Sequence, residues 1–433
     1  MRNRLEFFFN RLRERLWVKP LIACVLSVGG VLLAHLADGI EVAWKVPEIA
    51  QGSVVDLLKI IAASMLGVAT FAVASMVSAY SSTGQSATAR AFPLIVADDV
   101  SQNALSVFIG AFIYSIVALS ATTNDYFGKP GRFTLFVLTL LTLVAVVLMF
   151  VRWVDSIARL GRLGAVIDKV EQATTRSIER RRDEPWLGGV PLLGTPAGKA
   201  IYTERIGFLQ LVDVDLLQRL ASKHRVRISL AVILGTTIVP SRPLAYVLPD
   251  SADSGMPDQA DIEKAFTIGH LRQFDEDPRF GIVVLAEIAC RALSPAVNDP
   301  GTAIAVLDAL HRLFAVFGGP AKRAKPGCDR VWVPFLQLDD MVADGFTAIG
   351  RDGAHLVEVA MRLQLVLGEI GASGGGKDSA LVRRHADLAL ARSQEALDFA
   401  PDLEQVRKRH SAYWRAAPAA PAAPPSNERM NDA

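Results

Sequence analysis

Four long apolar segments lie in the first third of the chain, separated by polar stretches. They cover residues 21–36, which Trp17 and Val18 extend at the start, and residues 60–79, 103–122 and 133–151. A helix rises about 1.5 Å per residue, so about 20 apolar residues cross a hydrocarbon core about 30 Å thick. The pattern therefore predicts an α-helical membrane domain with four spans over residues 1–151.

The second apolar segment separates its small residues from its bulky ones. On one helical stripe, three or four positions apart, lie Ala63, Gly67, Thr70, Ala74, Ser78 and Ser81. Small faces let helix backbones approach closely in membranes, and hydroxyl groups can bond across the contact. Two interpretations stay open: a helix-packing face, within the chain or between copies, and a pore face that lines a water-filled pathway.

Positive charge gathers before the first span and after the fourth. Residues 1–19 interleave Arg and Lys with Leu and Phe, a pattern typical of an amphipathic helix on an anionic membrane surface. Residues 152–182 are again rich in arginine. The positive-inside rule then places the N- and C-termini in the cytoplasm, which agrees with an even number of spans.

The pattern after the fourth span predicts a cytoplasmic α+β domain. It divides into a helical stalk (152–182), a β-rich subdomain (183–257), a mainly helical subdomain (258–415) and a disordered Ala/Pro-rich tail (416–433). Short strand patterns and a hairpin-like stretch at 235–244 favour a small β-barrel-like part within the β-rich subdomain.

Composition excludes several classes of function. The formal net charge is only +2, so the chain lacks the basic signature of a nucleic-acid-binding protein. Cys24, Cys290 and Cys328 fit neither a disulfide framework nor a zinc site. We expect no cofactor, no metal and no nucleic-acid partner.

One acidic run is a candidate cation site. Asp275, Glu276 and Asp277 could bind a cation, but a solvated loop that caps a helix at Phe280 is the favoured interpretation. Other candidates lack a partner or frame at the required spacing: His355 with Glu358, Ser294, and Gly374 to Gly376 with Lys377. No catalytic residue is predicted, and an enzyme is the least favoured class.

Residues 291–303 read Arg-Ala-Leu-Ser-Pro-Ala-Val-Asn-Asp-Pro-Gly-Thr-Ala and interrupt a helical pattern. Asp299 before Pro300 predicts an N-cap followed by proline at the first helical position. With the preceding Asp-Pro-Arg-Phe-Gly at 277–281, this segment resembles a bacterial membrane-protein family known as domain of unknown function 2254. The positions that carry the family-like motif are Arg291, Ser294, Pro295, Asn298, Asp299, Pro300 and Thr302.

The resemblance covers nearly the whole chain except the tail. It implies four spans, a cytoplasmic domain and a bacterial inner-membrane location, and it assigns no catalytic residues. The chain departs from the family at Thr88-Ala89-Arg90, where the family has a central proline, so the turn there is not carried over.

Two functions remain as hypotheses. The first is an oligomeric channel or transporter, centred on the second span and regulated by its cytoplasmic domain. The alternative is a membrane-tethered sensing or scaffolding module without transport. The expected partners are the lipid bilayer and further copies of the same chain.

Overall fold

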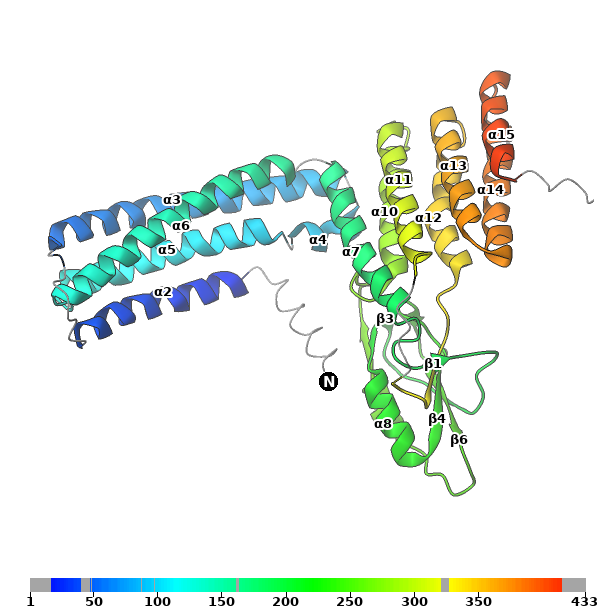
Figure 1. Ribbon diagram of the computed structural model, residues 1–433, viewed down its shortest axis with the longest axis horizontal. Coiled ribbons are helices and arrows are strands. Elements are labelled where there is room, and N and C mark those ends of the chain that lie inside the picture. Colours follow the sequence, from blue (N-terminus) through cyan, green and yellow to red (C-terminus); the bar gives the residue numbers. More distant parts are fainter. Residues whose placement is uncertain are drawn as a thin grey trace, which may run out of the picture. The chain divides into compact units, whose positions relative to one another are not determined.

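The computed structural model describes residues 17–39, 47, 49–86, 88–96, 98–160, 163–320 and 327–414. It is mainly helical (Figure 1). The chain divides into two compact units, Met1–Val284 with Ala324–Phe335, and Leu285–Arg323 with Leu336–Ala433. Most of the predicted N-terminal amphipathic helix, and the predicted tail, lie outside the described residues.

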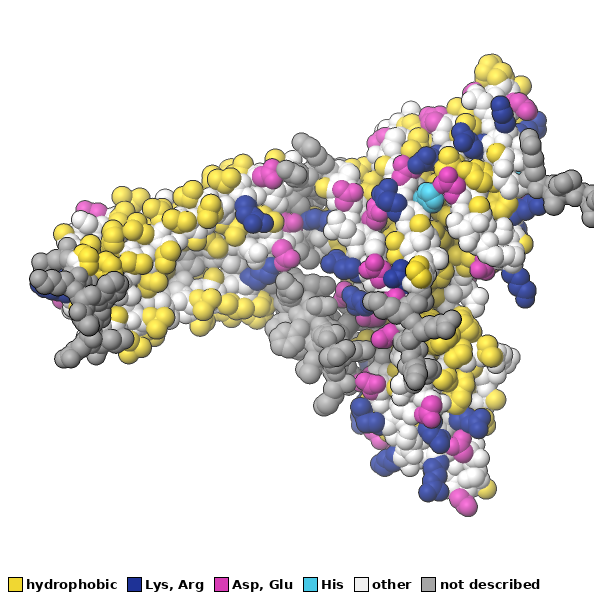
Figure 2. All heavy atoms as spheres, viewed as in Figure 1, with side chains coloured by type: hydrophobic (Ala, Val, Ile, Leu, Met, Phe, Trp, Pro, Cys, Tyr) yellow, Lys and Arg dark blue, Asp and Glu magenta, His cyan; other side chains and the backbone are white. Residues whose placement is uncertain are grey.

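All four predicted spans are helices that pack side by side into a bundle (Figure 1). The bundle helices are α2 (Val18–Leu36), α3 (Gln51–Ser86), α5 (Asp99–Thr123) and α6 (Lys129–Leu160), with short α4 (Phe92–Val96) before α5. Hydrophobic side chains cover most of the visible face of the bundle, and charged ones are sparse along it (Figure 2). The protein is therefore a membrane protein with several apolar helices.

A fifth helix is also long enough and apolar enough to cross a membrane. It is α11 (Pro300–Phe317), which the sequence pattern placed in the helical subdomain. Its mean hydropathy of 1.3 is below that of the four bundle helices, which range from 1.8 to 2.8.

Helix α5 is the buried centre of the bundle. It contacts α2, α3 and α6, and its buried residues recur along most of its length. Phe108 at its midpoint is fully buried and meets the Trp153 ring of α6 edge-on, with centroids 6.2 Å apart. The bundle is thus organised around the third span, whereas the sequence pattern drew attention to the second.

The rest of the first unit begins with amphipathic α7 (Leu163–Asp183) and continues into two sheets. Its strands are β1 (Val190–Pro191), β2 (Lys199–Ile201), β3 (Gly207–Val212), β4 (Val226–Leu230), β5 (Thr237–Ile238), β6 (Ala245–Pro249), β7 (Phe266–Gly269) and β8 (Val331–Val333). Its helices after α7 are α8 (Val214–His224), α9 (Gln259–Glu263) and the start of α10 (Pro278–Ala292).

These strands form two open sheets, and the described residues contain no closed barrel. One sheet has the order β1-β8-β4-β6-β2 and the other β5-β3-β7. The expected barrel-like part is not confirmed. Strand β8 comes from far along the chain and pairs in parallel with both β1 and β4. Local strand patterns carry no information about such a distant partner.

The second unit is a set of packed helices. Besides α11 and the end of α10 it contains α12 (Leu338–Asp352), α13 (Val357–Ser373), α14 (Gly376–Ala396) and α15 (Ala400–Trp414). Helix α15, which the sequence pattern did not predict, lays two aromatic rings on α13. A Cβ on Gly368 would lie 2.3 Å from the Tyr413 ring, and one on Gly371 would lie 2.0 Å from the Trp414 ring.

Candidate functional site

The small face of α3 is exposed within the chain. Its members Ala63, Gly67, Thr70, Ala74, Ser78 and Ser81 are all exposed. A Cβ on Gly67 would meet no atom within 4 Å, and Thr70 Oγ1 donates to the carbonyl of Leu66 at 2.9 Å. The opposite face of α3 carries the fully buried Leu58 and Ala72. The small face is therefore not a packing surface against another described span of the same chain.

The close helix contact of the bundle lies between α2 and α5 instead. A Cβ on Gly110 would sit 3.1 Å from the Cβ of Ala23. Across this contact, Ser27 Oγ donates to the carbonyl oxygen of Gly110 at 2.8 Å. A glycine therefore brings two backbones together here, with a hydroxyl bonding between them, as small residues do in membrane helices.

Buried polar groups inside the bundle bond mostly along their own helices. Ser106 and Thr122 of α5 donate to carbonyls one turn earlier, each at 2.7 Å. The Tyr114 hydroxyl crosses to α6, where it donates to the Leu135 carbonyl at 3.1 Å and lies 3.0 Å from Thr139 Oγ1. These bonds make the three hydroxyls compatible with an apolar surrounding, since an unbonded hydroxyl there is costly. The buried Ser115 hydroxyl of α5 is an exception, because it has no hydrogen-bond partner.

Carboxylates hold both ends of the bundle. At one end, Asp38 accepts hydrogen bonds from the backbone N–H groups of Gly128 and Gly131, at 2.9 and 2.7 Å. These groups lie at the N-terminal end of α6, where the helix dipole favours a negative charge. The two glycines allow this close approach, because a Cβ would lie 2.9 and 2.4 Å from the Asp38 carboxylate.

At the other end, Asp98 caps α5 and binds α7. It accepts from Ser101 N at 3.0 Å and from Lys169 Nζ at 2.9 Å, and Lys19 of α2 pairs with Asp99 at 2.5 Å. Burial raises the pKa of Asp98, but the bonds and charge of Lys169 and the bonds of Ser101 outweigh it, so the net pKa lies below its ordinary value. This carboxylate ties α7 to the bundle.

The acidic run at 275–277 joins a second contact of α7. Asp277 is 4 % exposed and binds Arg272 through two bonds, Nε to Oδ2 at 2.8 Å and Nη2 to Oδ1 at 3.0 Å. It also accepts from Phe280 N at 3.2 Å. The predicted cap at Phe280 is confirmed, but Asp277 is buried, so the expectation of a solvated loop is wrong for that residue. Burial raises the pKa of Asp277 despite these bonds.

Glycines let the chain close around this ion pair. Gly235 has a φ of +82°, and a Cβ there would lie 2.0 Å from Asp277 Oδ2. A Cβ on Gly281 would lie 1.8 Å from Thr174 Oγ1 of α7. Beside them, Arg180 of α7 pairs with Glu276 at 2.9 Å. Helix α7 thus contacts the start of α10 both by close backbone approach and by charge.

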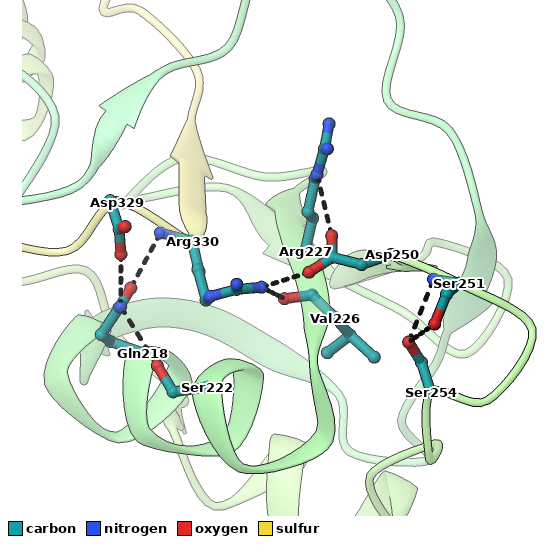
Figure 3. A network of polar contacts seen from close by, with 9 residues as sticks. All are labelled: Gln218, Ser222, Val226, Arg227, Asp250, Ser251, Ser254, Asp329 and Arg330. Atoms are coloured by element: carbon teal, nitrogen blue, oxygen red, sulfur yellow. Dashed lines mark hydrogen bonds and ion pairs between the residues drawn. The ribbon is translucent and has the colours of Figure 1, made fainter.

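A separate polar network connects strands of the five-stranded sheet to one another and to α8 (Figure 3). Asp250, after β6, accepts from Arg227 of β4 at 3.1 Å and from Arg330, just before β8, at 2.5 Å. Gln218 of α8 accepts from the Arg330 backbone N–H at 2.9 Å and donates to Asp329 at 2.7 Å. Because arginines already bind the Asp250 carboxylate, this network stabilises strand placement and offers no free general base.

The family-like motif forms the corner between α10 and α11. Asp299 caps α11, accepting from Thr302 N at 3.0 Å and Thr302 Oγ1 at 2.6 Å, and Pro300 follows at the start of the helix. This confirms the predicted cap. Ser294 Oγ donates to the Arg291 carbonyl at 2.7 Å, and Asn298 adopts a φ of +49°, which asparagine tolerates well.

Most of the corner's outer surface is exposed, namely Arg291, Pro295, Ala296, Val297 and Asn298. The glycine-rich stretch at 374–376 joins α13 to α14, as a helix linker should. Among the residues that the structure describes, no three His, Cys, Asp or Glu side chains gather closely enough to hold a metal ion.

Comparison with known proteins decides the family. Residues 13–369 match the family described as "Predicted membrane protein (DUF2254)". The chain belongs to this family. The DUF2254 match includes the bundle, α7, both sheets and the corner, and it ends within α13.

Two relatives of this DUF2254 protein are uncharacterised proteins of Mycobacterium bovis and Mycobacterium tuberculosis. Each is 32% identical over 160 residues, a match that covers 34% of this chain and 30% of the relative. The chain therefore spans less than a third of the length of these curated relatives. No solved structure matches the chain.

The sequence interpretation missed the buried polar residues of α7 and the central position of α5. A signal for α5 exists in the sequence, since Ala104, Ala111, Ser115 and Ala118 are small and recur at helical spacing. No comparable signal exists for the pairing of Arg180 with Glu276, because the two residues lie 96 positions apart.

Proposed function

We propose that the protein is a homo-oligomeric membrane channel or transporter in which the small face of α3 meets further copies of the chain. The exposure of that face carries the proposal. Lipid alone gives no reason to align Gly67 with Ala63 and Ala74, whereas a neighbouring helix backbone does. The bulky Leu66 and Val77, also exposed on α3, suit contact with lipid chains.

The proposed topology has four spans in a bacterial inner membrane, with the part after α6 in the cytoplasm. Charged residues on α11 argue against a fifth span. Asp308 pairs with Arg362 of α13, and His311 Nε2 lies 3.1 Å from Glu369. Ion pairs of this kind suit a water-exposed helix unit, since charges inside a bilayer are costly. The arginines after α6 support the cytoplasmic side.

Single cysteines test the role of the α3 face. In a background lacking Cys24, Cys290 and Cys328, Gly67→Cys should form disulfide-linked dimers in membranes on mild oxidation, and Leu66→Cys should not. If the face also lines a pathway, a water-soluble thiol reagent labels positions 63, 67, 70 and 74 in a helical rhythm. Equal cross-linking at 66 and 67 contradicts the proposal.

Ion flux in liposomes separates transport from simple assembly. Gly67→Leu should abolish flux and shift the oligomer distribution, because the added side chain separates the copies. Gly30→Leu is the matched control, since a Cβ on this α2 glycine also meets nothing within 4 Å. Absence of flux from wild-type protein that cross-links as predicted refutes the channel or transporter.

A membrane-tethered sensing module is the second candidate, and the contacts of α7 favour it. Lys169 binds Asp98 at the end of the bundle, while Arg180, three turns later, binds Glu276. One helix thus contacts both the bundle and the segment before α10, as a signalling connection requires. Specific capture of a partner by the full chain, lost in Lys169→Met and without any flux, would favour this candidate.

A further inference from the structure

Arg181 in the last turn of α7 is a buried cation without an ion pair of its own. The residue is 7 % exposed, and its Nη1 atom has no hydrogen-bond partner. Nη2 reaches only the carbonyl oxygen of Pro334, at 3.4 Å. Among the described residues, no carboxylate forms an ion pair with it. A buried charge without a partner is strongly unfavourable, so a partner for this guanidinium is expected.

Two more buried donors without partners lie close to it along the chain. Ser177 Oγ is one helical turn before Arg181 on the same face of α7, and Trp186 Nε1 follows the end of the helix. The Trp186 ring packs edge-on against Phe335 at 6.1 Å, next to the Pro334 carbonyl that Arg181 reaches. The stretch therefore holds three unsatisfied groups that can each donate a hydrogen bond.

The two carboxylates whose charges act on Arg181 already bind other arginines. Glu276 is engaged by Arg180 and Asp277 by Arg272. Burial lowers the pKa of Arg181 to about 10, while the charges of Glu276 and Asp277 act in the opposite direction. The guanidinium therefore stays positive at neutral pH.

We propose that Arg181, with Ser177 and Trp186, forms a binding site for a small oxyanion, either a carboxylate or a phosphate group. A guanidinium fork matches two oxygens of such a group, and hydroxyl and indole donors complete its bonding. Water could satisfy the hydrogen bonds, but it would leave the guanidinium without an ion pair of its own. An oxyanion does both. The site does not depend on transport, because it lies in the part of the chain after the bundle.

Thermal unfolding of the detergent-purified full chain tests the site. The probes are inorganic phosphate and acetate, each compared with chloride at equal ionic strength. One or both should raise the wild-type midpoint saturably, as a ligand that binds only the folded state does. The anion whose effect saturates at the lower concentration, phosphate or acetate, is the preferred one.

Arg181→Met should reverse its order of thermal stability relative to wild type when oxyanion is added. Without oxyanion its midpoint should equal or exceed that of wild type, because an apolar side chain replaces an unpaired buried charge. With saturating oxyanion, wild type should become the more stable protein, and the variant should not respond. Arg180→Met, which changes a half-exposed neighbour, should keep the response.

A milder variant guards against failure of Arg181→Met to fold. Ser177→Ala removes one donor to a charged group, so the apparent dissociation constant should rise about tenfold in a calorimetric titration. The proposal is overturned if neither oxyanion gives a saturable shift in wild type, or if Arg181→Met and wild type respond equally. An unchanged dissociation constant in Ser177→Ala removes that residue from the site.

Discussion

The interior of the membrane bundle and the contact between α7 and the start of α10 both bury polar side chains, but they satisfy them differently. In the bundle, Ser106 and Thr122 bond to carbonyls of their own helix. At the α7 contact, Arg180 pairs with Glu276, 96 positions later, and Asp277 binds Arg272 in a buried pair. A bond within one helix forms whichever helix packs beside it. An ion pair between two segments forms only when those two segments meet.

This difference indicates what determines each contact. Bundle association depends mainly on shape, because most of its hydroxyl groups bond within their own helix and few, such as those of Ser27 and Tyr114, bond to a neighbouring helix. The α7 contact depends on charge as well as shape, because a buried ion that loses its partner is strongly unfavourable. Substitutions that remove a charge should therefore destabilise the α7 contact most. Substitutions of glycine by a larger residue should destabilise both regions, to a degree set by how close the nearest atoms lie.

Removal of the Asp277 carboxylate should have the largest effect. Asp277→Ala leaves the Arg272 guanidinium without its buried partner and α10 without its cap, so the free energy of unfolding should fall by about 3–5 kcal/mol. Chemical denaturation of the full chain in detergent measures it. Glu276→Gln, whose partner Arg180 is half-exposed, is the matched control with a loss of about 0–1 kcal/mol. Equal losses of stability in the two variants would contradict the difference between the buried pair and the half-exposed pair.

Glycine substitutions compare the two regions by volume. Gly281→Ala forces a Cβ to within 1.8 Å of Thr174 Oγ1, and such overpacking should cost about 1–3 kcal/mol. Gly110→Ala in the bundle brings a Cβ only to 3.1 Å from Ala23 and should cost less. Thermal unfolding of both variants gives the order. Thr174→Ala should partly rescue Gly281→Ala, and a larger loss for Gly110→Ala would reverse the comparison.

The Asp299 cap is as local as the hydroxyl bonds of the bundle, so its loss should have a moderate effect. Asp299→Ala should lower the free energy of unfolding by about 1 kcal/mol. Bonds from the Thr302 hydroxyl and backbone lower the pKa of Asp299 below its ordinary value in the folded protein. Its stabilisation is therefore present above the ordinary pKa and is lost as the pH falls through the folded pKa. A stability–pH profile that Asp299→Ala leaves unchanged in acid would contradict this.

Gly67→Ala should have the smallest effect on the folding of one chain. A Cβ there meets nothing within 4 Å, so unfolding of the monomer should shift by no more than the gain in helix propensity, about 1 kcal/mol in favour of alanine. Cross-linking between copies, measured on the same samples, should decline. A monomer clearly destabilised by Gly67→Ala would mean that the face packs within the chain after all.

The sequence predicted what depends on local pattern. Apolar length found all four bundle helices, and a short polar side chain before a proline located the Asp299 cap of α11. The motif residues from Arg291 to Thr302 were correctly placed at a sharp corner. Each of these features is specified by residues within a few positions of one another, which is why pattern alone was enough.

The remaining features depend on contacts between distant residues. Helix α15 has a polar average composition, and its packing rests on Trp414 lying against Gly371, 43 positions earlier. Asp277 was expected in a solvated loop because its sequence neighbours are charged, whereas its burial comes from Gly235 and α7. The predicted barrel-like part is absent from the described residues for the same reason, since β8 pairs with strands far away in the sequence.

The position of β8 has a consequence for the order in which the protein folds. Val331–Val333 lies between β1 and β4 in the five-stranded sheet, although the chain forms α10 and α11 before reaching it. Until residue 333 has left the ribosome, β1 has no partner in this sheet and one edge of β4 stays open. Pairing over such sequence distances is slow, so the sheet closes late during synthesis. A nascent chain that stalls before residue 331 exposes an unpaired strand edge, the kind of surface that chaperones shield.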